Sequence, residues 1–138
     1  MEKIRILVAE DEPLILRTIS DRLTEEGHEV FRAENGRVAL RLLEQHPVDV
    51  VLTDVVMPEV DGIEVILHLR KAYPGTRVVC MSAHDAVYLD IMHQLGAVRV
   101  LVKPFDWREL HEAVQGVMAD EAGVRTGREI CRQRAIEA

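Results

Sequence analysis

Apolar and polar residues alternate in blocks along the chain, and the spacing of the apolar positions differs between blocks. Five short blocks rich in apolar residues predict strands over residues 4–9, 29–33, 50–54, 77–82 and 98–102. The third block contains Val50, Val51 and Leu52 in succession, which is typical of a central strand buried on both faces of a parallel sheet. The chain is expected to pair each strand with a helix.

Apolar residues at every third or fourth position predict a helix after each strand. Pro13 suits a first helical turn, Gly27 and Gly96 each follow a predicted helix, and Gly62 begins one. The expected buried stripes are Ile15, Ile19 and Leu23; Ala39, Leu42 and Leu43; Ile63, Ile66 and Leu67; Val87, Ile91 and Leu95; and Leu110, Val114 and Val117. This alternation predicts an α/β fold in which helices cover both faces of a parallel sheet.

Length and composition suit one domain with a real core, because 48% of the 138 residues are hydrophobic. We expect residues 1–120 to form this domain. Residues 121–138 would be a tail, either a short helix over 128–136 or a frayed end, because Gly123 and Gly127 interrupt an arginine-containing stretch. No second folded domain is expected.

Charge and cysteine content narrow the class of protein. Residues 1–120 contain 13 Lys and Arg against 21 Asp and Glu, so a nucleic-acid partner is not expected. Cys80 lies in an apolar strand and Cys131 in the polar tail, which predicts free thiols in a reducing compartment. The start of the chain lacks an apolar run long enough for a signal peptide or membrane span, so we expect a cytoplasmic protein without membrane insertion.

Polar residues stand at the ends of four of the five predicted strands: Glu10 and Asp11 after the first, Asp54 at the end of the third, Ser82 of the fourth and Lys103 after the fifth. In a parallel sheet these carboxyl ends meet at one edge, where open α/β sheets bind ligands. Each residue alone also fits a cap, a turn or a solvated strand end. Their coincidence at four strand ends favours a functional site.

Carboxylates gathered at this edge would repel one another by about 4 kcal/mol per pair at ~4 Å and an effective dielectric near 20. Mg²⁺ would relieve the repulsion, because it binds carboxylate oxygens and keeps positions for water and phosphate oxygens. Asp11 and Asp54 suit this ion. Lys103 and the Ser82 hydroxyl would then contact the remaining oxygens of a phosphoryl group.

The segments around these residues resemble the receiver domain of response regulators in two-component signalling. The matching segments are residues 6–13, the loop 54–62 with Met57-Pro58 and Asp61-Gly62, residues 81–83 and Lys103-Pro104-Phe105. The resemblance covers residues 4 to about 119. It implies a flavodoxin-like, doubly wound, five-stranded parallel sheet of order 2-1-3-4-5 with five helices.

The resemblance also implies a phosphorelay function. Asp54 would receive a phosphoryl group from a histidine kinase or phosphotransfer protein in a Mg²⁺-dependent reaction that switches binding of a downstream protein. The domain would catalyse its own phosphorylation and dephosphorylation without turning over an external substrate, and homodimerisation on phosphorylation is compatible with this. The implied metal ligands are Glu10 (through water), Asp11, Asp54 and the backbone carbonyl of Val56, with Ser82 as switch hydroxyl and Lys103 as the family's lysine.

Two positions bear on how such a receiver would work. Val100 lies three residues before the lysine, where the family usually carries an aromatic that rotates on activation, so the usual read-out is in doubt. His84 lies two residues after Ser82, at a position that tunes phosphate lifetime in the family. The six histidines are scattered over different elements and predict no histidine metal site.

Three other functions are weighed against this one. A phosphatase of the haloacid-dehalogenase type needs a second Asp at position 56, which is Val56. A flavin or dinucleotide site would not tolerate the acids at 10–12 beside phosphate unless a metal intervened. A receiver-like interaction module that works without phosphate is the remaining alternative, and acetyl-phosphate labelling would separate it from a phosphoacceptor.

Overall fold

The computed structural model describes residues 3–55, 57, 60–82, 90, 94–95 and 99–119. Five strands form one parallel sheet in the order β2-β1-β3-β4-β5, which confirms the predicted order. The strands are β1 (Arg5–Ala9), β2 (Glu29–Ala33), β3 (Val50–Asp54), β4 (Arg77–Ser82) and β5 (Arg99–Val102). Every residue of β3 is buried, as its apolar sequence predicted.

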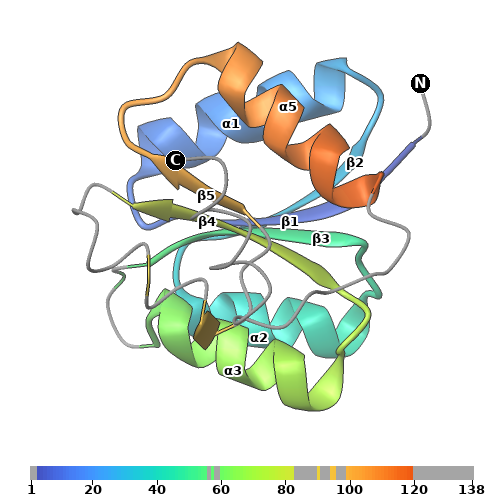
Figure 1. The fold of residues 1–138 in the computed structure, drawn as a ribbon, viewed down its shortest axis with the longest axis vertical. Helices are drawn as coiled ribbons and strands as arrows, with labels where there is room; N and C mark the ends of the chain where they lie inside the picture. The colour runs from blue at the N-terminus through green and yellow to red at the C-terminus, as the bar shows by residue number, and fades with distance from the viewer. Residues whose placement is uncertain are drawn as a thin grey trace.

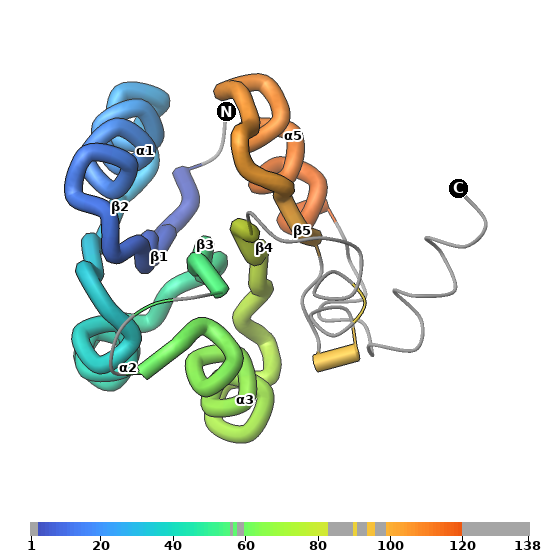
Figure 2. The backbone as a smooth tube through the Cα atoms, turned by 90° about the vertical axis from the view of Figure 1, so that its left-hand side faces the viewer, coloured from blue at the N-terminus to red at the C-terminus, as the bar shows by residue number. Residues whose placement is uncertain are grey.

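Helices cover both faces of this sheet (Figures 1 and 2). On one face lie α1 (Pro13–Glu25) and α5 (Trp107–Met118), and on the other lie α2 (Gly36–Gln45) and α3 (Gly62–Ala72). Two apolar clusters therefore form, one on each side of the sheet. No helix in the described ranges is long and apolar enough to cross a membrane.

The described part of the chain contains four helices, so the predicted count of five is not confirmed. The predicted helix over Val87 to Leu95 falls mostly outside the described residues, although Asp90, Gln94 and Leu95 are helical. The tail at 121–138, Val56, His84 and Cys131 also lie outside the described residues.

Capping side chains fix where three helices begin. The side chains of Asn35, Asp61 and Asp106 each accept the backbone N–H three residues later, at the first turns of α2, α3 and α5. Pro13 is the first residue of α1, as predicted. Gly27 follows that helix with a φ of 95°, a left-handed conformation that glycine adopts without steric cost. Local sequence thus sets where these helices begin or end.

The predicted stripe of α3 is wrong at one position, because Leu67 is 49% exposed. The buried side of this helix is formed by Val65, Ile66 and Leu69. At about 100° per residue, Val65, Ile66 and Leu69 fall on one side of the helix, whereas Leu67 points to nearly the opposite side. The correction leaves the face of the sheet covered by α3 unchanged.

Candidate functional site

The predicted site residues that the structure describes all lie at the carboxyl edge of the sheet. Glu10 directly follows β1, Asp54 ends β3, and Ser82 ends β4. The fifth strand joins them, because the backbone N–H of Lys103 donates to the carbonyl of Ser82 at 2.7 Å. Glu10, Asp54 and Ser82 are buried, whereas Asp11 is exposed. One polar site therefore spans four strand ends.

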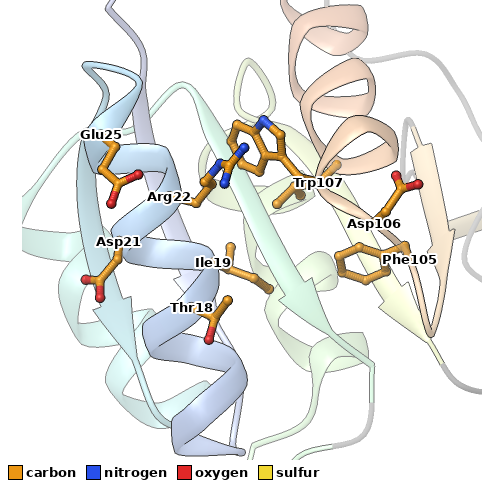
Figure 3. Close-up of a pocket in the computed structure, with 9 residues that line it drawn as sticks. Thr18, Ile19, Asp21, Arg22, Glu25, Phe105, Asp106 and Trp107 are labelled. Atoms are coloured by element: carbon orange, nitrogen blue, oxygen red, sulfur yellow. The ribbon is translucent and has the colours of Figure 1, made fainter.

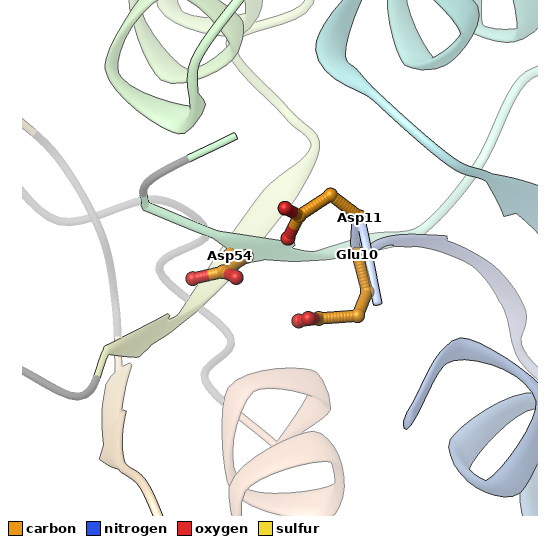
Figure 4. A group of neighbouring side chains, drawn as sticks. All are labelled: Glu10, Asp11 and Asp54. Carbon is orange, nitrogen blue, oxygen red and sulfur yellow. The ribbon is translucent and has the colours of Figure 1, made fainter. Parts of the chain in front are cut away.

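Three carboxylates approach one another at this edge. Glu10 and Asp11 extend toward Asp54 (Figure 4), and one oxygen from each lies within 4.8 Å of the others. All the donors are carboxylate oxygens, which is the chemistry that hard divalent cations prefer. The cluster could hold a metal ion, and its mixed burial leaves Asp11 open to water on one side.

A single ammonium group links two of these carboxylates. Lys103 Nζ donates to Glu10 Oε2 at 3.0 Å and to Asp54 Oδ2 at 3.1 Å. Burial alone would lower the pKa of Lys103, but its hydrogen bonds to the two carboxylates outweigh burial and raise the pKa, so the group is a fixed positive charge. Sequence reasoning assigned this lysine to phosphoryl oxygens and did not anticipate that it pairs with Glu10, 93 residues away.

The pKa of Glu10 is raised to about 7, chiefly because the carboxyl group is buried. The hydrogen bond from Lys103 opposes this rise, and the negative charge of Asp54 adds to it. A buried carboxyl group with a raised pKa is stabilised either by binding a proton or by a nearby cation. Because one ammonium is shared by two carboxylates, this edge can still bind a further proton or cation.

Two glycines hold the loop after Asp54 close to the helices. A Cβ at Gly62 would lie 2.2 Å from the carbonyl oxygen of Asp54, and a Cβ at Gly36 would lie 1.9 Å from that of Val60. The Gly62 N–H also donates to the carbonyl of Val55 at 2.9 Å. Sequence reasoning used Gly62 as a helix start and as part of the family resemblance, and it did not anticipate either contact. Their contacts show that backbone packing, rather than a special φ, requires glycine here.

A parallel 2-1-3-4-5 sheet with carboxylates and a lysine at its carboxyl edge defines the class of receiver-like α/β domains. Residues 6–115 match the response regulator receiver domain, and the chain belongs to this family. The match confirms the resemblance seen in the sequence, and the alternative of a phosphate-independent module is not favoured.

Known relatives agree with this assignment. The chain is 33% identical to the transcriptional regulatory protein GlrR of Escherichia coli K12 over 118 residues, which are 85% of this chain and 27% of GlrR. It is 40% identical to TcrA of Mycobacterium tuberculosis H37Rv over 109 residues, which are 78% of this chain and 43% of TcrA. The chain thus spans between about a quarter and half of the length of these curated relatives.

Solved structures show the same fold. The chemotaxis protein CheY4 of Vibrio cholerae superposes with a TM-score of 0.79 at 28% identity, covering 84% of this chain and 99% of CheY4. The response regulator TrrA of Thermotoga maritima, solved in complex with Mg²⁺-BeF, gives a TM-score of 0.75 at 35% identity, covering 83% of this chain and 98% of TrrA.

Proposed function

We propose that Asp54 accepts a phosphoryl group from the phosphohistidine of a histidine kinase or phosphotransfer protein, and that the modified domain changes its binding to a downstream protein. The observation that carries this proposal is the pairing of Lys103 Nζ with both Glu10 and Asp54. A nearly buried carboxylate with a fixed ammonium at 3.1 Å has the nucleophile and part of the charge stabilisation that phosphoryl transfer requires.

The proposed reaction exchanges one bond for another. An oxygen of Asp54 attacks phosphorus, the bond from phosphorus to the histidine nitrogen breaks, and the nitrogen keeps the electron pair. Lys103 already lies within hydrogen-bond distance of Asp54, so its ammonium needs only a small movement to contact a phosphoryl oxygen. The Ser82 hydroxyl would donate to another of the three oxygens.

The metal in this proposal is Mg²⁺, held by Asp11, Asp54 and the backbone carbonyl of Val56, with Glu10 acting through water. The all-oxygen donor set of the acidic cluster supports a hard cation. Bound Mg²⁺ would neutralise charge on the phosphoryl oxygens. The relative TrrA was solved with Mg²⁺-BeF, which agrees with the same use of the site here.

The remaining parts of the proposal concern setting and organisation. We propose a cytoplasmic receiver domain over residues 1–120 with a C-terminal tail, a domain that catalyses its own phosphorylation and dephosphorylation. Homodimerisation on phosphorylation is part of this proposal. The net charge of −7 agrees with protein partners rather than direct contact with nucleic acid.

Labelling of the full chain with radioactive acetyl phosphate tests the central step. We expect Mg²⁺-dependent incorporation that is released by hydroxylamine, as for an acyl phosphate. Asp54→Asn should abolish it. Asp61→Asn is the matched control, because Asn also caps a helix and α3 should begin unchanged.

Equal labelling of Asp54→Asn and the parent would disprove the assignment of the phosphoacceptor. Labelling that persists undiminished in EDTA would disprove the role of the metal. Loss of labelling in Asp61→Asn as well would show that labelling depends on the conformation of the loop, so the loss in Asp54→Asn would not identify Asp54 as the acceptor.

A further inference from the structure

The end of the loop between β3 and α3 lies against the start of α2. A Cβ on Gly36, the first residue of α2, would lie 1.9 Å from the carbonyl oxygen of Val60 and 2.6 Å from its carbonyl carbon. Two residues after Val60, a Cβ on Gly62 would lie 2.2 Å from the carbonyl oxygen of Asp54. Close backbone contacts thus connect α2, through Val60 and Gly62, to Asp54 at the end of β3.

Hydrogen bonds fix both ends of this connection. At the α2 end, the side chain of Asn35 accepts the Val38 N–H at 2.9 Å, and the buried side of the helix packs in the core. At the β3 end, the Val55 N–H donates to the carbonyl of Met81 at 3.1 Å, which ties the loop to β4. The Val55 carbonyl in turn accepts the Gly62 N–H at 2.9 Å. A displaced Val60 would therefore be resisted from both sides.

The glycine at position 36 is explained by this close approach and not by its backbone conformation. Gly27 is the one glycine with a positive φ in the described part of the chain. Glycine is also a poorer helix former than alanine. An alanine at position 36 would force the Val60 carbonyl oxygen to retreat from 1.9 Å to at least 3.0 Å, and the atom that must move belongs to the backbone.

We propose that Gly36 is a positioning residue for Asp54 and for the Mg²⁺ site at this edge of the sheet. Because position 36 has no side chain, Val60 lies directly against α2, and the loop holds Asp54 where its carboxylate meets those of Glu10 and Asp11. A methyl group at position 36 would shift the loop and weaken this arrangement. The inference rests on the proposed function, since it concerns the same carboxylates.

Titration of the full chain with Mg²⁺, followed by the amide signals of the isotopically labelled protein, tests the inference without phosphate. We expect Gly36→Ala to raise the half-saturating Mg²⁺ concentration about tenfold or more, because residues that orient metal ligands typically contribute about 10- to 100-fold to affinity. In EDTA, the variant should shift the amide signals of Asp54 and Val55. Acetyl-phosphate labelling at saturating Mg²⁺ should be slower, since a misplacement of ~1 Å can cost ~100-fold in rate.

Two control variants separate positioning from general effects of substitution. Gly116→Ala also changes a helical glycine, but its Cβ would meet the flexible guanidinium of Arg99, at 2.8 Å from Nη2. Ile19→Val removes a buried methylene beside the groove between α1 and α5, on the other face of the sheet (Figure 3), and so lowers stability without touching the loop. Both should bind Mg²⁺ within about twofold of the parent.

Val60→Gly probes the same contact without adding an atom, and it serves if Gly36→Ala does not fold. Loosening the loop in this way should raise the half-saturating Mg²⁺ concentration at least about twofold. Parental Mg²⁺ binding in folded Gly36→Ala, or in Val60→Gly where Gly36→Ala does not fold, would overturn the inference.

The outcomes distinguish this inference from the proposed function. If the parent and Gly36→Ala bind Mg²⁺ and accept phosphate equally well, the inference is wrong and the proposed function stands. If the parent accepts no phosphate, the phosphoacceptor assignment is wrong, whereas weaker Mg²⁺ binding by Gly36→Ala would still support the positioning role. A parent that binds no Mg²⁺ would overturn both.

Discussion

The two edges of the sheet both contain buried or partly buried polar side chains, but they use them differently. At the amino edge, His28 and Asp49 each accept one backbone N–H from the start of the first strand, at 3.2 and 2.9 Å. At the carboxyl edge, Glu10 and Asp54 share the ammonium of Lys103, and Glu10 also accepts the Glu12 N–H at 3.4 Å. The polar groups at the amino edge complete backbone hydrogen bonds, whereas those at the carboxyl edge are mainly charged groups that gather around one another.

The same contrast extends to protonation. Burial, together with the charge of His111, lowers the pKa of His28, so the amino edge favours a neutral imidazole. Burial raises the pKa of Glu10 to about 7, so this carboxyl group takes up a proton at a higher pH than an exposed glutamate does. Glu10 should therefore make the domain less stable as the pH rises, and His28 should make it less stable as the pH falls. The predictions below remove these groups, or disturb the edges around them, one at a time.

The largest effect is expected for Glu10→Gln in EDTA. The folded-state pKa of Glu10 lies above its unfolded value of 4.5, so its contribution is complete below pH 4.5 and is lost as the pH rises through 7. The parent should lose stability over this range, on the order of 3 kcal/mol at about 1.4 kcal/mol per pKa unit. Urea unfolding at pH 5 and 8 should show that Glu10→Gln removes most of this loss.

Glu34→Gln, at an exposed position, provides the control for the loss of one carboxylate and should keep the pH dependence of the parent. If the free energy of unfolding of Glu10→Gln falls between pH 5 and 8 as much as that of the parent, another group causes the pH dependence.

Gly62→Ala should break the carboxyl edge sterically. Its Cβ would meet the carbonyl oxygen of Asp54 at 2.2 Å, and backbone atoms cannot move aside as a flexible side chain can. We expect a loss of about 1–3 kcal/mol in the free energy of unfolding together with weaker acetyl-phosphate labelling. Gly75→Ala is the control, since nothing lies within 4 Å of its added Cβ. Equal stability of the two variants would show that the loop after Asp54 adapts.

The strands, and the grouping of polar residues at one edge of the sheet, could be predicted from the sequence. The blocks over Glu29–Ala33 and Arg77–Ser82 match β2 and β4 at both ends, because turn and capping residues flank them. The grouping of Glu10, Asp54 and Ser82 followed from parallel topology alone.

Three details could not be predicted. Apolar spacing did not distinguish Leu67 from Leu69 in α3, because both fit an approximate helical stripe. The ion pair of Lys103 with Glu10 depends on side-chain reach across the sheet, which no local pattern records. The backbone contact at Gly62 likewise depends on how closely a loop approaches a helix.

A smaller effect is expected at the amino edge from His28→Asn. The lowered pKa means that the unfolded chain binds more protons, so the parent should lose stability as the pH falls below about 6.5. Asn can still offer an oxygen to the Ile4 N–H but does not titrate, so unfolding between pH 7 and 5 should show a flatter slope. His46→Asn, next to Phe31, should keep the slope of the parent. A parental slope in His28→Asn would exclude this imidazole as its cause.

The smallest effect is expected for Val100→Ala, which tests how the carboxyl edge communicates with the rest of the domain. Val100 is half-buried beside the apolar cluster on the α2–α3 face, and its β-branched side chain is too short and stiff to move as an aromatic would. We therefore expect Mg²⁺ with beryllofluoride to raise the free energy of unfolding of Val100→Ala by the same amount as in the parent, within ~0.65 kcal/mol or about threefold in affinity. The basal stability should fall by about 1 kcal/mol for the lost methyl groups. If the ligand-dependent increase instead disappears while Asp54 still accepts phosphate, Val100 itself takes part in the switch. If it is retained, the change at the carboxyl edge reaches the surface by a route other than β5, for which the segment after Ser82 is the adjoining candidate.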